Sequence, residues 1–319
     1  MPKLKWFIWL VLWLPLQAAA MAPEARDWLM KMSQARQQAT FEGVFVYSRG
    51  RDMTSMRILH RYVGGVEQER LIALDGDRRE IVRNGNQVIC IFPDNKQVAL
   101  RQALPGGPFG GAILGVEPME RFYDVRVIGH ERVAGATVVH LQLRARDADR
   151  YSYDLWLEAS TGLLVKSWIV DTDGEPLERF HFTELRLNPE LDDALFEVPK
   201  GQGVVRHVTS TADASRPGAM KSWAPGWLPA GFVRATTEVT ASPDPMADMA
   251  QTYTDGLASL TVFVEPLAGG MPEGGMRVGA SAAYTTVRKV AGKAMRVTVV
   301  GEVPLPTARK VADSVGGNA

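Results

Sequence analysis

Much of this chain alternates apolar and polar side chains with a period of two. In the first such run, Phe41, Gly43 and Phe45 occupy alternate positions, which is the pattern of a strand with one face toward a core. Turn sequences such as 75–77 and 84–86 separate the runs. Strands joined by such short turns must pair antiparallel. The sequence therefore predicts a mainly β (α+β) chain whose large sheet must curl or cover its inner face.

Two domains follow from where this pattern stops and resumes. We expect a large domain at 21–200, a Gly- and Ser-rich linker at 201–222 and a small C-terminal domain at 223–319. An amphipathic helix at 25–35 opens the first domain and a helix at 305–314 closes the second. The expected strands are 41–48, 57–63, 67–73, 80–83, 87–92, 125–133, 137–144, 151–158, 163–170, 177–187, 232–239, 250–254, 258–265, 282–289 and 294–300.

The first twenty residues indicate export. Lys3 and Lys5 precede an apolar run at 6–16 and the small residues 18–20, the order of a secretory signal peptide cleaved after Ala20. The apolar run is too short to span a bilayer, so an uncleaved anchor is the less favoured alternative. We therefore expect the mature protein in the periplasm. Cys90 is the only cysteine, which excludes an intramolecular disulfide, and we interpret it as a buried thiol.

Charge and motif content argue against several function classes. The chain has 36 basic and 36 acidic residues and no basic block, so we expect no nucleic-acid partner. It has no nucleophile elbow and no phosphate-binding loop, and no two histidines are one helical turn apart. The acids at 171–175 open like a calcium loop, but Pro176 and Phe182 replace its Gly and its closing Glu. We interpret them as a hairpin turn and predict no catalytic residues, no metal site and no cofactor.

Two other features leave alternatives open. The acids between residues 67 and 80 supply an acid/base pair only if they converge, and interleaved arginines favour a solvated hairpin tip. Bulky apolar side chains occupy both faces of the strands at 151–158 and 163–170, so both faces are covered. An ordinary two-sided core is the favoured reason, and an apolar cavity for acyl chains or an apolar peptide is the alternative.

Six motifs follow one another along the chain. They are F-x-G-x-F-V-Y-x-R at 41–49, L-D-G at 74–76, T-G-L-L-x-K-S at 161–167, W-L-P-x-G-F at 227–232, F-V-E-P-L at 263–267 and V-T-V-V-G-E-V-P at 297–304. No single motif is specific, but their succession resembles the RseB/MucB family of periplasmic regulators. The resemblance runs from about residue 26 to residue 309, through both expected domains.

The resemblance implies a function. Similar proteins bind the periplasmic part of a transmembrane anti-sigma factor and protect it from regulated proteolysis, which makes them negative regulators of the envelope stress response. It also implies a half-open barrel like that of periplasmic lipoprotein carriers, release by lipopolysaccharide or another lipid, and self-association into homo-oligomers. A periplasmic carrier or chaperone for lipids or lipoproteins is the alternative. The family pattern transfers no catalytic set, so we expect no enzyme.

The candidate binding residues are aromatic side chains chosen from strand geometry, and each position also suits an ordinary core. The cavity candidates are Phe45, Tyr47, Trp156, Trp168, Phe180 and Phe182. The candidates for the partner surface, which the resemblance places mainly on the small domain, are Trp223, Trp227, Phe232, Tyr253 and Phe263.

Overall fold

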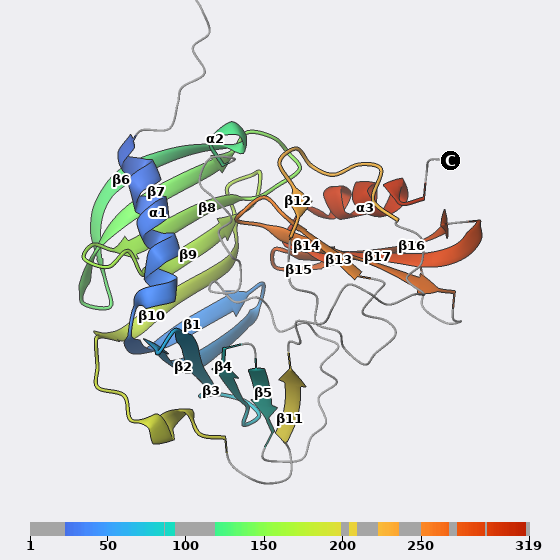
Figure 1. Cartoon of the computed structure of the whole chain (residues 1–319). Helices are drawn as coiled ribbons and strands as arrows, with labels where there is room; N and C mark the ends of the chain where they lie inside the picture. Colours follow the sequence, from blue (N-terminus) through green and yellow to red (C-terminus); the bar gives the residue numbers. More distant parts are fainter. Residues whose placement is uncertain are drawn as a thin grey trace, which may run out of the picture.

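The structure is a computed structural model, and Figure 1 shows its arrangement. It describes residues 23–85, 87–92, 119–198, 204–208, 223–235, 250–267, 273–290 and 292–316. The expected signal peptide and most of the expected linker lie outside these residues. Within the described ranges, no helix combines the length and apolar character needed to cross a membrane.

In the described residues of the large domain, eleven antiparallel strands form one open sheet, which confirms the predicted fold class (Figure 1). Its spatial order is β11-β5-β4-β3-β2-β1-β10-β9-β8-β7-β6. The strands are β1 Phe41–Arg49, β2 Asp52–Val63, β3 Val66–Ala73, β4 Glu80–Asn84, β5 Gln87–Ile91, β6 Tyr123–Val133, β7 Ala136–Ala145, β8 Ser152–Glu158, β9 Leu164–Val170, β10 Pro176–Leu187 and β11 Val204–Val208.

Two meanders of five strands each, together with strand β11 at one edge, build this sheet. Strands β1 to β5 pair in sequence order, and so do β6 to β10. The two meanders join along β1 and β10, where Phe45 lies opposite Phe182 and Tyr47 opposite Phe180. The short turns predict the pairs inside each meander, but not this long-range seam.

Helix α1 (Pro23–Gln38) covers one face of strands β6 to β9 (Figure 1). Its apolar stripe buries Ala25, Leu29 and Met32 against Leu141 and Leu155 of the sheet, so the predicted amphipathic helix is confirmed. A short helix, α2 (Met119–Phe122), leads into β6, and a 3-10 helix, η1 (Asp193–Phe196), follows β10. Cys90 is a buried free thiol in β5, where burial raises its pKa.

Part of the expected linker belongs to the large sheet instead. Residues Val204–Val208 form β11 and pair antiparallel with β5, with Val204 opposite Ile91 and Val208 opposite Gln87. The linker prediction for these five positions is therefore corrected. Its composition was rich in loop-forming residues, but pairing with an open sheet edge overrides weak local propensity.

The part of the small domain that the structure describes is a six-stranded antiparallel sheet with one helix packed on it (Figure 1). Helix α3 (Leu305–Ser314) matches the predicted range and buries Ala308 and Val311 against Val297 and Val299. The exposed, Gly-containing β15 escaped the sequence analysis because it shows no alternation. The strands are β12 Val233–Arg234, β13 Ala250–Thr254, β14 Ser259–Pro266, β15 Gly274–Val278, β16 Ser281–Val290 and β17 Lys293–Gly301.

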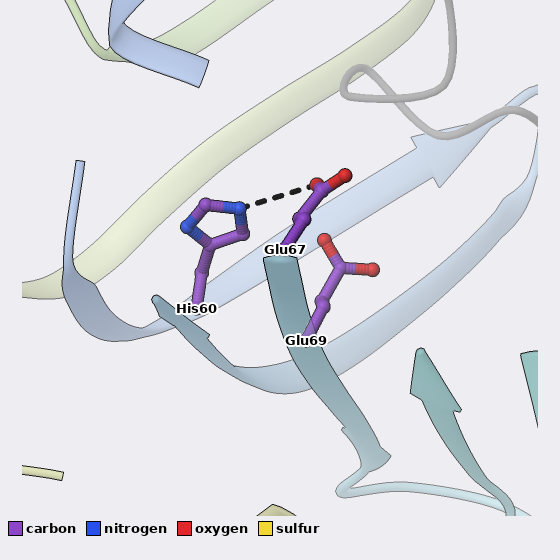
Figure 2. Close-up of side chains that lie close together, drawn as sticks. All are labelled: His60, Glu67 and Glu69. Carbon is purple, nitrogen blue, oxygen red and sulfur yellow. Dashed lines mark hydrogen bonds and ion pairs between the residues drawn. The ribbon is translucent and has the colours of Figure 1, made fainter. Parts of the chain in front are cut away.

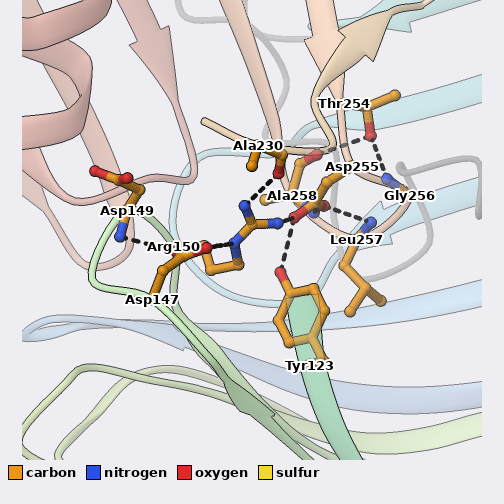
Figure 3. Close-up of polar contacts among 10 residues, drawn as sticks. All are labelled: Tyr123, Asp147, Asp149, Arg150, Ala230, Thr254, Asp255, Gly256, Leu257 and Ala258. Atoms are coloured by element: carbon orange, nitrogen blue, oxygen red, sulfur yellow. Dashed lines mark hydrogen bonds and ion pairs between the residues drawn. The ribbon is translucent and has the colours of Figure 1, made fainter. Parts of the chain in front are cut away.

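A buried ion pair joins the two domains (Figure 3). Arg150, in the loop between β7 and β8, is 0% exposed, and its Nη1 donates to Oδ2 of Asp255 at 2.7 Å. Its Nη2 donates to the carbonyl of Ala230 at 2.5 Å and its Nε to Oδ1 of Asp147 at 3.0 Å. The hydroxyl of Tyr123 also donates to Asp255, at 2.9 Å. Every polar end of this pair is therefore satisfied, which a buried charge pair requires.

Aromatic rings enclose the same pair. The Arg150 guanidinium lies 4.8 Å from the ring centroid of Phe122 and 5.6 Å from that of Phe232. A Cβ atom at Gly231 would lie 2.1 Å from the Phe122 ring, and Gly231 has a φ of +88°. Only glycine fits this close approach without displacing the ring. Phe122 comes from the large domain and Phe232 from the small one. The contact between the two domains, called the joint below, therefore has an apolar as well as an ionic component around Arg150 and Asp255.

Replacing Arg150 with Ala should destabilise the protein by about 3–5 kcal/mol, because it leaves the buried Asp255 carboxylate without its cation. Urea unfolding of the mature chain measures this loss. The matched control is Arg126→Ala, which removes the exposed pair with Asp124 on β6 and should cost at most about 1 kcal/mol. Equal losses in the two variants would contradict the importance assigned to the joint.

Candidate functional site

A second contact between the domains lies around Glu178 of β10. Its carboxylate accepts the backbone N–H of Ala280 at 2.9 Å and the hydroxyl of Tyr47. The turn from β15 to β16 comes so close that a Cβ atom at Gly279 would lie 2.3 Å from Cγ of Arg49. Gly279 has a φ of +60°, which also favours glycine. One carboxylate of the large domain thus anchors a turn of the small domain.

Glu302, which follows β17, brings a second carboxyl to this contact. Burial raises its pKa to about 7, the negative charge of Glu178 adds to the rise, and Arg49 opposes it. Burial also raises the pKa of Glu178, although hydrogen bonds from Tyr47 and Ala280 work against that rise. Two carboxyl groups thus share one nearby cation, Arg49. Glu302 therefore changes its protonation state near neutral pH.

Four of the six cavity candidates lie on one face of the sheet at the β1–β10 seam. The ring centroids of Phe45 and Phe180 are 5.0 Å apart, and those of Phe180 and Phe182 are 5.2 Å apart. All three side chains are buried, and Tyr47 packs beside them. These rings fill the space between themselves, so the seam is a packed aromatic cluster in this structure.

The other two candidates, Trp156 and Trp168, lie on the opposite face. Trp156 pairs with Lys166 and Trp168 with Arg179, and paired residues project to the same side of a sheet. The two indole centroids are 5.2 Å apart, and the Lys166 ammonium lies 3.8 Å from the Trp156 centroid. His140 stacks on the other side of Trp156 at 4.2 Å. The structure therefore divides the six candidates between two faces.

A hollow of about 670 Å³ opens beside these two tryptophans. Arg144, Asp154 and the turn at 171–174 also line it, and it reaches Arg150 at the joint. In that turn, Oδ1 of Asp171 accepts the backbone N–H groups of Asp173 and Glu175 at 3.0 and 2.9 Å, which confirms the hairpin-turn interpretation. Charged groups beside indole rings suit a polypeptide segment better than an acyl chain.

Three of the five partner-surface candidates belong to the core of the small domain. Trp223, Phe232 and Tyr253 are 7%, 6% and 4% exposed. Trp227 is partly buried, and the ammonium of Lys310 lies 3.6 Å from its ring centroid. Phe263 is partly buried as well. Only these last two are accessible enough to touch a partner.

Phe263 faces away from the helix-covered side of the small sheet. It alternates with Val262 and Val264, which are fully buried in the core under α3, so its ring projects to the other face. On that face it lies opposite Thr298 of β17. Among the described residues, α3 is the helix that packs on this sheet. It covers the face that carries Val262 and Val264, and it does not cover the face that carries Phe263.

Sequence reasoning missed the charged residues of the joint. Asp255 and Glu302 stand in segments with apolar neighbours. That pattern could have indicated that each is a polar residue next to the hydrophobic core. Arg150 lies in a polar loop and carries no such signal. Arg150 and Asp255 are 105 positions apart, so no local pattern connects them.

Changing Glu302 to Gln should flatten the pH dependence of stability. The folded pKa of about 7 exceeds the ordinary value of 4.5, so between these values the folded chain holds a proton that the unfolded chain has lost. The free energy of unfolding therefore falls as pH rises through this window. Urea unfolding at pH 5 and pH 8 should show a smaller fall for Glu302→Gln than for the wild type. The exposed Glu175→Gln is the control, and a fall equal to the wild type's in Glu302→Gln would refute the assignment.

Family models match both domains in the expected order. The model of the MucB/RseB N-terminal domain matches residues 24–199. The model of the MucB/RseB C-terminal domain matches residues 217–316. Together they span most of the chain.

Whole-chain comparisons agree with these models. The sigma factor AlgU regulatory protein MucB of Pseudomonas aeruginosa is 36% identical over 303 residues, which cover 93% of this chain and 92% of that protein. The sigma-E factor regulatory protein RseB of Escherichia coli K12 is 27% identical over 308 residues, with coverage of 93% and 92%. The solved complex structure of Pseudomonas aeruginosa MucA/MucB matches with a TM-score of 0.70 and 32% identity, covering 92% of this chain and 98% of that chain. This chain therefore belongs to the MucB/RseB family.

Proposed function

We propose that this protein is a periplasmic negative regulator of an envelope-stress sigma factor. It binds the periplasmic part of a transmembrane anti-sigma factor and protects it from regulated proteolysis. The observation that carries the proposal is the match over 92% of this chain to a relative solved in complex with MucA. The proposal includes export through the signal peptide, self-association into homo-oligomers and no catalytic activity.

The joint supports a mechanism that uses both domains. The proposal treats 21–208 as the large domain and 223–319 as the small one. The Arg150–Asp255 pair and the Glu178–Ala280 contact fix these domains relative to each other. A partner segment that touches the hollow beside Trp168 and the small domain would therefore depend on the state of the joint.

Lipid release fits the same mechanism. The aromatic cluster at the β1–β10 seam is packed, so an acyl chain enters only if its rings separate. Each buried methylene would return about 0.8 kcal/mol against that cost. Rearrangement of the seam would disturb Tyr47, whose hydroxyl donates to Glu178, and Glu178 in turn accepts the Ala280 N–H of the small domain. Lipid and anti-sigma factor would then each lower the affinity of the other by the same factor.

Isothermal titration of the mature chain with the periplasmic segment of its own organism's anti-sigma factor tests this function. We expect saturable binding, weakened when lipopolysaccharide is present. Failure to bind the segment would overturn the proposal, and recovery of many lipoproteins in a pull-down would favour the carrier alternative. Equal affinities with and without bound lipid would remove only the release step.

Phe263→Ser should weaken binding of the segment by about tenfold or more, because partly buried aromatic residues contribute strongly to interfaces. The melting temperature should change little, since Phe263 lies outside the core of the small domain. Met276→Ser is the matched control, because Met276 is 63% exposed on the edge strand β15. If both variants bind like the wild type, the Phe263 face is not the partner surface.

A further inference from the structure

Three side chains that ligate metals converge on the β2–β3 hairpin (Figure 2). Nε2 of His60 lies 3.2 Å from Oε1 of Glu67, and the carboxylate of Glu69 lies beside them. One ligand atom from each of the three residues lies within 4.8 Å of the other two. Donors around a single zinc ion are each about 2.0–2.2 Å from the metal, so small side-chain rotations suffice to close this set around one ion.

The hairpin register produces this convergence. His60 of β2 lies directly opposite Glu69 of β3. Glu67 is two residues before Glu69, so it projects from the same face. The tight turn between β2 and β3 fixes this register, since a slip of one residue would send both carboxylates to the other face. The interleaved arginines favoured a solvated hairpin tip for these acids, whereas the structure places Glu67 and Glu69 inside β3 beside a buried imidazole ring.

The imidazole is held in the orientation of a metal ligand. Nδ1 of His60 lies 2.8 Å from the carbonyl oxygen of Ala39, which accepts only, so Nδ1 carries a proton and donates it. The ring stacks on Phe41 with centroids 4.9 Å apart and is 2% exposed. Ligating histidines commonly donate their second N–H to a backbone carbonyl in this way, which leaves the other nitrogen for the metal.

A second histidine of the same sheet shows what an ordinary ion-pair arrangement looks like. Nδ1 of His140 lies 3.2 Å from Glu131, and its Nε2 lies 2.9 Å from Asp154. Both ring nitrogens are therefore occupied by carboxylates on different sides, and Arg144 also binds Asp154 at 2.9 Å. Glu131 and Asp154 therefore lie at different nitrogens of the His140 ring and cannot bind one metal ion together with the same nitrogen. At His60, both carboxylates approach the nitrogen that the backbone leaves available.

We propose that His60, Glu67 and Glu69 bind one divalent transition-metal ion of the zinc class. Nε2 and two carboxylate oxygens supply three ligands, and water completes the coordination. An imidazole ligand favours zinc and its neighbours over calcium and magnesium, which prefer oxygen ligands. The ion clamps the β2–β3 hairpin and, through the His60–Ala39 hydrogen bond, the connection from α1 to β1.

Zinc chloride titrated into untagged, EDTA-treated mature protein tests the site by calorimetry and thermal melting. We expect one zinc ion per chain at this site and a rise in melting temperature, because an ion bound only to the folded chain stabilises it. Calcium and magnesium at the same concentration should give neither effect. Glu69→Gln and Glu67→Gln keep the side-chain shape and should each weaken zinc binding about tenfold or more.

His60→Asn keeps a donor near the Ala39 carbonyl and removes Nε2, so it should abolish the site. Glu131→Gln is the control for a histidine–carboxylate pair elsewhere in the sheet and should bind zinc like the wild type. If His60→Asn fails to fold, the two Glu→Gln variants decide. Absence of stoichiometric zinc binding, or wild-type affinity in both Glu→Gln variants, overturns the proposal.

Discussion

The buried pair of Arg150 and Asp255 is the interaction on which the arrangement of the two domains depends. Two charges removed from water remain stable only when each finds the other and every remaining donor and acceptor is satisfied. Asp147, Tyr123 and the Ala230 carbonyl meet that requirement here. Few relative positions of the domains satisfy all these contacts at once, so the pair specifies one geometry of the joint.

The second contact between the domains, around Glu178, differs in its chemistry from the Arg150–Asp255 pair. Glu178 and Glu302 place two carboxyl groups near one cation, Arg49, so its stability depends on a proton. One contact is thus a buried arginine–carboxylate pair, and the other responds to pH through Glu302. The release step proposed above would need two states that differ by only a few kcal/mol. The contact around Glu302 is the part of the joint that gain or loss of a proton changes.

The proposed metal site stands apart from this joint. His60 and Glu69 meet because one hairpin places them opposite each other, and the strand pattern and the turn at 64–65 were both visible in the sequence. Their pairing was therefore within reach of local reasoning. The burial of the ring was not, since it comes from Phe41 and from the Ala39 carbonyl before β1. The distinction between a solvated tip and a ligand set required both contacts.

Local patterns in the sequence determined most strands, both long helices, the antiparallel class and the family. Period-two alternation, helical periodicity and turn residues act over a few positions, so they are readable without a structure. Tertiary structure decided the β1–β10 seam, the pairing of β11 with β5, and the division of the aromatic candidates between two faces of the sheet. It also decided the joint, because Arg150 and Asp255 are 105 positions apart. Such contacts depend on how whole sheets pack, and no local pattern encodes which distant partner satisfies a buried charge.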